Sequence, residues 1–206
     1  MPIDAFVFDL VGVLVDVDFR RAIGRWAAAA GVPAGHLAGR FRRDEAYCAH
    51  ERGEMDDARY FAHLRSSLDL QIDHEEMLGG WNAVLGEPLP GVEALVRHLA
   101  GELPLYVFSN TNPAHIAHFK PRYRALLSHF RTTFTSCDVG ARKPETEAFA
   151  RVAGRIGAAP SRLAFFDDLE ENVAGAARAG FQAFHVSSAE EIAAIAEALL
   201  AVRKAR

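Results

Sequence analysis

The stretch FVFDLVGVLVD, Phe6–Asp16, decides the fold. Its first three residues and the preceding Ala5 form a fully apolar, β-rich run, Ala5–Phe8. This run is followed directly by an acidic residue, Asp9. Fully apolar runs of this length are typical of strands buried on both faces, as in a parallel sheet. The stretch therefore predicts a buried strand with a carboxylate at its carboxyl end.

Later runs of the same kind predict more strands of that sheet. They are Leu105–Phe108 before Ser109, Thr132–Thr135 before Ser136, Leu163–Phe166 before Asp167, and Phe181–Val186 before Ser187. Helical patterns lie between them: Val92 to Leu99, Glu145 to Ile156 with Pro144 in the first turn, Asn172 to Ala179 before Gly180, and Ile192 to Val202. This alternation predicts an α/β fold, with a Rossmann-like parallel sheet core sandwiched by helices.

Residues 18–88 break the alternation, because they contain helical patterns and no convincing strand. The helical stretches are Phe19–Ala30, Ala34–His50, Asp57–Ser67 and Asp73–Val84. Pro88, Pro90 and Gly91 mark the return to the sheet. We predict a catalytic core of residues 1–17 and 88–206, with an inserted all-α cap domain at 18–87.

Composition narrows the classes of protein to consider. The 206 residues carry a formal net charge of −4, with a pI of about 6.1, and the sequence has no stripe of basic residues. Neither observation favours binding to nucleic acid. No apolar run approaches the ~20 residues of a membrane span, and the first ten residues do not resemble a signal peptide. Cys48 and Cys137 are expected to be reduced thiols. We expect a cytoplasmic protein without membrane partners, as a monomer or homodimer.

The residues that end the predicted strands are expected to share one edge of the sheet, where open parallel sheets bind ligands. Asp9, Ser109 and the pair Asp167 and Asp168 end three of these strands, and Lys143 follows the predicted strand Thr132–Thr135. Each residue alone has an ordinary explanation, as a helix cap or a solvated charge. One hydroxyl, one ammonium and three carboxylates together predict a reaction site.

Four segments carry a resemblance to a known family: FVFDLVGVLVD, VFSNT, ARKPE and FFDDLEEN. In this order they resemble the motifs of the haloacid-dehalogenase-like hydrolases. In that family the first type of cap domain is inserted at the position of the helical insertion in this chain. His50–Glu54, HERGE, resembles the cap of the α-D-glucose-1-phosphate phosphatase-like branch. The resemblance covers nearly the whole chain. It implies a Mg²⁺-dependent phosphatase acting on a small phosphorylated metabolite, with a sugar phosphate as the expected substrate.

The resemblance also implies a nucleophile and a metal site. Asp9 would attack phosphorus and form an aspartyl-phosphate, which splits hydrolysis into two displacements. Mg²⁺ would be held by the Asp9 side chain, the Val11 backbone carbonyl and the Asp168 carboxylate, because this ion prefers oxygen ligands. Asp167 would be a further ligand or a partner of one.

Other residues would bind the phosphoryl group. Ser109 and the Asn110 backbone N–H would donate to phosphoryl oxygens, and Lys143 would neutralise charge on Asp9 and on the transferring group. Asn172 is expected to support Lys143 or the metal loop, or else to cap a helix. Gly12 is expected to allow a tight turn.

The chain departs from the pattern of most phosphatases of this family at Val11. They carry a second Asp there, which protonates the leaving alcohol and is worth roughly 10²–10⁴ in rate. An enzyme without this Asp could work in three ways: its substrate has a better leaving group, the cap supplies the acid, or the reaction is slow. His50 and Glu51 are the cap candidates, and His115 and His118 are candidates for the pocket entrance.

Two other functions fit the loss of that Asp. A 2-haloacid dehalogenase would use Asp9 to displace halide from carbon without a metal, although the acidic pair Asp167 and Asp168 favours Mg²⁺ and phosphate. A non-catalytic phosphate-binding or regulatory protein would keep the scaffold without turnover, although its retention of Asp9, Lys143 and Asp168 favours catalysis.

Overall fold

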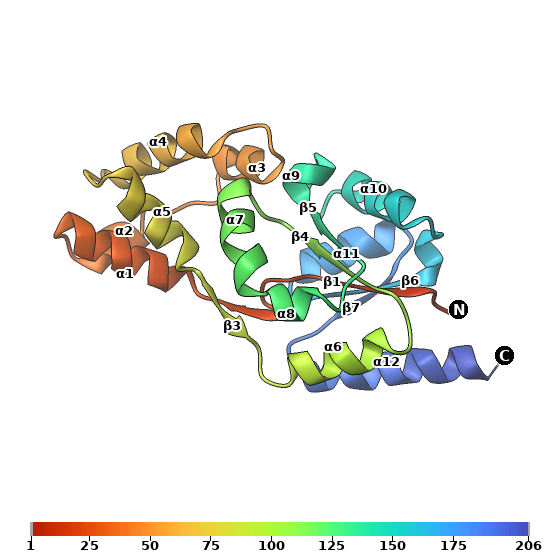
Figure 1. Cartoon of the computed structure of the whole chain (residues 1–206). Coiled ribbons are helices and arrows are strands. Elements are labelled where there is room, and N and C mark those ends of the chain that lie inside the picture. Colours follow the sequence, from red (N-terminus) through yellow and green to blue (C-terminus); the bar gives the residue numbers. More distant parts are fainter. Residues whose placement is uncertain (1, 206) are drawn as a thin grey trace.

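In the computed structural model, which describes residues 2–205, a five-stranded parallel sheet carries helices on both faces (Figure 1). The strand order is β5-β4-β1-β6-β7. The strands are β1 (Ala5–Phe8), β4 (Leu105–Ser109), β5 (Thr132–Thr135), β6 (Leu163–Asp167) and β7 (Gln182–His185). The predicted α/β class is confirmed, and all five strands coincide with the apolar runs of the sequence.

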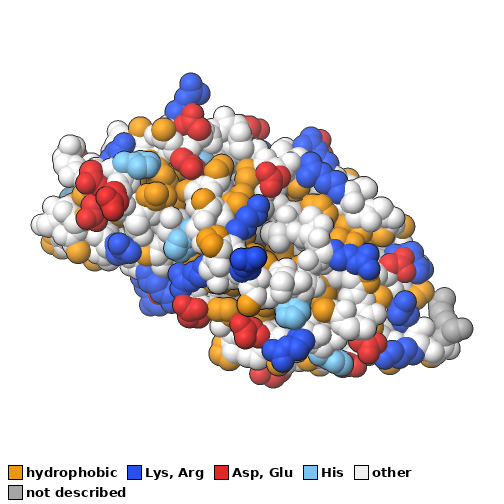
Figure 2. All heavy atoms as spheres, in the orientation of Figure 1, with side chains coloured by type: hydrophobic (Ala, Val, Ile, Leu, Met, Phe, Trp, Pro, Cys, Tyr) orange, Lys and Arg blue, Asp and Glu red, His pale blue; other side chains and the backbone are white. Residues whose placement is uncertain are grey.

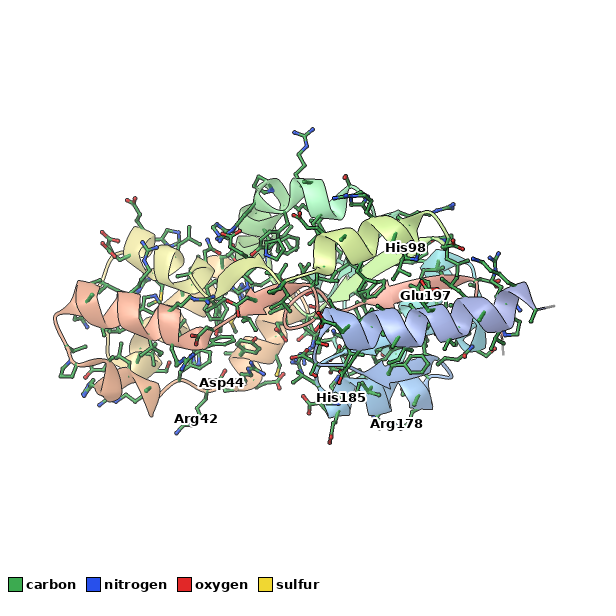
Figure 3. The ribbon with its side chains drawn as sticks, turned by 90° about the horizontal axis from the view of Figure 1, so that it is seen from below. Arg42, Asp44, His98, Arg178, His185 and Glu197 are labelled. Atoms are coloured by element: carbon green, nitrogen blue, oxygen red, sulfur yellow. The ribbon has the colours of Figure 1, made fainter. Side chains whose placement is uncertain are left out.

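Alternate side chains of the central strands feed two separate cores. Phe6 and Phe8 of β1 point into one core, and Val7 points into the other. α6 (Val92–Ala100) and α12 (Ala189–Lys204) lie side by side over the first core, as Figures 1 and 3 show. α10 (Thr146–Ile156) and α11 (Glu170–Arg178) close the second. Both faces of β1 are therefore covered, which explains its unbroken apolar sequence.

The helices of the insertion gather at the end of the molecule that lies away from both termini (Figure 1). They are α1 (Phe19–Ala30), α2 (Ala34–Ala38), α3 (Glu45–Glu51), α4 (Asp57–Leu68) and α5 (His74–Asn82). An Asp side chain accepts a backbone N–H at the start of α1, α3, α4 and α5. These four caps fix where the helices begin.

Three local predictions are wrong. Residues 34–50 form two helices, because the chain leaves the helix at Gly39 and Asp44 caps a new one. A strand does occur in the insertion: β3 (Leu85–Pro88) pairs antiparallel with β2 (Val15–Val17). Gly and Pro weaken its strand propensity, so the pairing rather than the local sequence makes it. Pro144 lies before α10, whose N-cap is Glu145, and not in its first turn.

The structure adds short helices that the sequence patterns did not predict. They are α7 (Pro113–Arg122), α8 (Arg124–Leu127), α9 (Ser136–Val139) and the 3₁₀ turn Pro160–Arg162. Within residues 2–205, no helix combines the length and the apolar character that crossing a bilayer requires. Charged side chains of both signs are interspersed over the face drawn in Figure 2.

The helical insertion is anchored to the sheet unit through α5 and α7. The Trp81 ring of α5 stacks on His115 of α7 with centroids 4.9 Å apart. His115 Nε2 lies 3.1 Å from the Trp81 carbonyl oxygen, and Trp81 Nε1 donates to Asn112 Oδ1 across 3.3 Å. Buried apolar side chains run without a break from the insertion into the first core. This contact holds the insertion over the carboxyl edge of the sheet.

Candidate active site

The carboxyl ends of β1 and β6 bring Asp9 and Asp167 together around Lys143. The Lys143 ammonium lies 2.9 Å from Asp9 Oδ1 and 2.6 Å from Asp167 Oδ2. Only 1% of Lys143 is exposed, and its ammonium lies 5.6 Å and 5.4 Å from the ring centroids of Phe108 and Phe165. Burial of a lysine is tolerated here because two carboxylates and two rings compensate its charge.

Burial and crowding shift the pKa values of this group. Burial raises the pKa of Asp9 to about 7; Lys143 opposes this shift and the Asp167 carboxylate adds to it. Burial alone would lower the pKa of Lys143, but Asp9 and Asp167 raise it above its ordinary value. The lysine is therefore charged, and a further cation at Asp9 would relieve the crowding of negative charge.

Asp168 supplies a third carboxylate with an unsatisfied oxygen. Its Oδ1 is buried and has no hydrogen-bond partner among the described residues. Burial and the neighbouring Asp167 raise the pKa of Asp168. Oxygens of Asp9, Asp167 and Asp168 all lie within 4.8 Å of one another, and a Cβ at Gly12, where φ is +95°, would collide with Asp168. This donor set fits a hard divalent cation.

Asp167 is held on both oxygens. Oδ1 accepts the Leu169 backbone N–H at 2.9 Å and the Asn172 side-chain amide at 2.9 Å, while Oδ2 accepts from Lys143. Asp167 is fully buried and does not line the pocket described below. The predicted support of Lys143 by Asn172 therefore runs through Asp167, and α11 fixes the lysine.

The VFSNT segment makes contacts that the sequence patterns did not predict. The Asn110 side chain bridges the backbone of Lys143: its Nδ2 donates to the Lys143 carbonyl at 2.9 Å, and its Oδ1 accepts the Lys143 N–H at 2.8 Å. Ser109 is 1% exposed and outside the pocket lining, with its hydroxyl 3.5 Å from the Asn110 carbonyl. Thr111 also lines the pocket, although the sequence patterns did not single it out as a site residue. Its position directly after Asn110 in the VFSNT motif could have indicated it.

A pocket of about 830 Å³, open solvent at its mouth included, lies between this edge and the helical insertion. Asp9, Lys143 and Asp168 line it from the sheet side. The insertion contributes Phe19, Arg43, Tyr47, Val84 and Glu51. Much of the remaining wall is apolar: Val11, Val17, Leu85, Phe119 and Leu169. The pocket thus offers a charged end at the sheet and a mixed apolar and basic end at the insertion.

Neither predicted acid of the insertion is free to protonate a substrate. His50 is outside the pocket lining, its Nε2 lies 2.7 Å from Asp57, and burial lowers its pKa. Glu51 does line the pocket, but Arg142 Nε donates to its Oε2 at 2.8 Å. Glu51 therefore acts as an acceptor for Arg142.

The two histidines after VFSNT differ in position. His115 lines the pocket, and burial lowers its pKa to about 4. Its Nε2–H donates to the Trp81 carbonyl, and its Nδ1 accepts from the Asn112 amide at 3.2 Å. Both ring nitrogens are thus occupied. His118 lies outside this pocket, beside Arg122.

Two curated relatives resemble parts of the chain. An enolase-phosphatase E1 from Bradyrhizobium sp. strain BTAi1 is 37% identical over 94 residues, 45% of this chain and 40% of the relative. The chloroplast flavin mononucleotide hydrolase 1 of Arabidopsis thaliana is 30% identical over 148 residues, 69% of this chain and 57% of the relative. The chain spans about half the length of these curated relatives.

Solved structures resemble nearly the whole chain. A haloacid-dehalogenase-like family enzyme from Bacteroides thetaiotaomicron, in complex with magnesium and inorganic phosphate, has a TM-score of 0.77 at 25% identity, covering 89% of this chain and 93% of that one. The L-2-haloacid dehalogenase from Xanthobacter autotrophicus has a TM-score of 0.65 at 21% identity, covering 96% of this chain and 82% of that one. The fold alone therefore does not separate the two chemistries.

Family membership follows from the sequence itself. The family model described as haloacid dehalogenase-like hydrolase matches residues 3–180, which include all four motif segments and the residues gathered around Lys143. The chain belongs to the haloacid dehalogenase-like hydrolases.

Proposed function

We propose that this hydrolase is a Mg²⁺-dependent phosphatase, which removes phosphate from a small phosphorylated metabolite through an aspartyl-phosphate on Asp9. The observation that carries the proposal is the group of Asp9, Lys143 and Asp168 on the sheet side of the pocket. The names of two relatives describe phosphate hydrolysis, and the Bacteroides enzyme was crystallised with magnesium and phosphate. All three observations support the same reaction.

The metal would be held by Asp9, Asp168 and the Val11 carbonyl. When bound, Mg²⁺ would neutralise the repulsion between the nucleophile and the phosphate dianion and orient the phosphoryl group. The unpartnered Asp168 Oδ1 supports its role as a ligand. Asp167 would serve as the partner of Lys143, because its oxygens already accept from three donors.

The geometry of Asp9 suggests which oxygen attacks. Oδ1 accepts the Leu10 backbone N–H at 2.7 Å and the Lys143 ammonium, whereas no hydrogen bond from the described residues ends on Oδ2. Oδ2 would form a bond to phosphorus while the bond from phosphorus to the substrate oxygen breaks, and that oxygen keeps the electron pair. Water would then attack phosphorus, which frees Asp9 and inorganic phosphate. Lys143 would balance the charge in both steps, with Ser109 and the Asn110 N–H as further donors.

The leaving group would depart without a proton from a side chain. His50, Glu51 and His115 are each engaged elsewhere, and Val11 has no proton to give. Substrates with acidic leaving groups, such as anomeric phosphates, would therefore react fastest. This preference agrees with the sugar-phosphate expectation, and residues 18–87 would form the cap that selects the sugar.

One set of assays tests the proposal. Purified protein would be incubated with a panel of phosphorylated metabolites and with 2-chloropropionate, with Mg²⁺ and with EDTA, beside Asp9→Asn. Phosphate release that needs both Mg²⁺ and Asp9 would support a phosphatase. Chloride release in EDTA would show a dehalogenase. Release of neither phosphate nor chloride would show a binding protein.

A further inference from the structure

Arg43 presents a cation to the pocket from the helical insertion, whereas Asp9 and Lys143 line the pocket from the sheet side. It lies in the segment between α2 and α3, is exposed and lines the pocket. Its guanidinium carbon lies 5.1 Å from the ring centroid of Phe19 and 6.0 Å from that of Tyr47. Stacking on these rings holds the planar group in place at the wall formed by the insertion.

The other cations of the pocket are already paired. Lys143 pairs with Asp9 and Asp167, and Arg142 pairs with Glu51. Arg43 forms no ion pair within the part of the chain that the structure describes, residues 2–205. A charged group of the substrate therefore finds one free guanidinium on the wall formed by the insertion.

The surroundings of Arg43 favour an anion over a group of hydroxyls. Val17, Phe19 and Leu85 also line the pocket and offer a sugar no side-chain hydrogen bonds. A guanidinium matches the two oxygens of a carboxylate or phosphate with parallel hydrogen bonds, which are stronger than neutral ones.

We propose that the substrate is a phosphomonoester that carries a second anionic group, a carboxylate or a further phosphate, and that Arg43 binds this group. The proposal rests on the proposed function, since the first phosphate must occupy the site at Asp9. A phosphorylated sugar acid would satisfy both this requirement and the sugar-phosphate expectation. Arg43 is then a specificity-determining residue.

The test compares esters that differ only in the distal charge. The probes are 3- and 4-carboxyphenyl phosphate and the corresponding neutral carbamoylphenyl phosphates, assayed with Mg²⁺ for wild type, Arg43→Gln, Arg43→Lys and Arg42→Gln. Arg42 is the matched control, because it is exposed, lies outside the pocket lining and points to solvent (Figure 3). The readout is the ratio of kcat/KM for the charged ester over its neutral partner, in which leaving-group differences cancel between variants.

We expect Arg43→Gln to lower this ratio about tenfold to a hundredfold for at least one isomer, the size of one charge-assisted contact. Arg43→Lys should recover part of it, and Arg42→Gln should leave it unchanged. If the ratio is unchanged in Arg43→Gln and hydrolysis still needs Asp9 and Mg²⁺, the proposed role of Arg43 is wrong. The proposed phosphatase function would then still hold. Absence of phosphate release from every ester would overturn both.

Discussion

Lys143 donates to Asp167 Oδ2 across 2.6 Å, and the other oxygen of that carboxylate accepts from Leu169 and Asn172. The lysine is therefore fixed by a carboxylate that is buried behind the pocket. Asp168, its neighbour in sequence, faces the pocket with an unpartnered oxygen. The two adjacent aspartates have opposite structural roles, which gives a matched pair of variants.

Asp167→Asn should lower the free energy of unfolding by about 3 kcal/mol, because it removes one partner of a buried ion pair. Asp168→Asn should leave it within about 1 kcal/mol of wild type in EDTA, since the lost charge had no partner. Urea unfolding followed by circular dichroism measures both. Equal losses for the two variants would contradict the division of roles.

Mg²⁺ should stabilise the folded protein. At a concentration 100 times its Kd, the ion would add about 2.7 kcal/mol, or roughly 5–10 °C in Tm for a chain of this size. Thermal scans with Mg²⁺ and with EDTA measure the shift. In Asp168→Asn the shift should largely disappear, whereas a full shift in that variant would exclude Asp168 as a ligand.

His115 should contribute less to stability as the pH drops from about 6.5 to 4. It has a pKa of about 4 in the folded protein, because of its burial, against about 6.5 when unfolded. The unfolded chain then binds the proton first, so the contribution of His115 falls by up to about 3 kcal/mol across this window and is complete above it. Burial lowers the pKa of His50 as well, which acts in the same direction, whereas the raised pKa of Asp9 acts in the opposite one.

His115→Asn tests the origin of this pH dependence. The variant should be less stable than wild type at pH 7, because it loses the stacking on Trp81, and this difference in stability should shrink between pH 7 and pH 5. Unfolding at a series of pH values gives the slope. A slope equal to that of wild type would assign the titration to other groups.

Hydrolysis should depend steeply on the leaving group. Because no side chain protonates the departing oxygen, kcat/KM should rise at least a hundredfold from alkyl to aryl phosphates, the scale of the missing acid catalysis. Val11→Asp supplies an acid and should flatten the dependence by accelerating alkyl esters. If Val11→Asp slows every ester, valine is instead tuned to the natural substrate.

The strands and the position of Asp9 at the end of one of them could be predicted from the sequence because their causes are local. A strand covered on both faces is apolar throughout, as in Ala5–Phe8, and the chain reversal after it leaves Asp9 at the ligand-binding edge. The clustering of Asp9, Lys143 and Asp167 follows from parallel topology alone. The family motifs then assign the chemistry to these positions.

Other features depend on contacts that a linear pattern does not record. β3 contains Gly86 and Pro88 and exists because β2 pairs with it. Glu51 and His115 have the chemistry of acids, but their partners Arg142 and Trp81 come from distant segments. Whether a titratable side chain is free or engaged is a property of the folded neighbourhood, so the proton donor could not be chosen from sequence.

The pairing of Val17 with Leu85 has a consequence for the evolution and redesign of this protein. The chain leaves the sheet unit at Val17 and returns to it at Leu85. Because these two residues are paired, the segment between them begins and ends at neighbouring points. A different helical segment could be joined at Val17 and Leu85 without altering the order or direction of the five parallel strands. The sheet unit and the helical segment could thus be inherited, or exchanged, as separate modules.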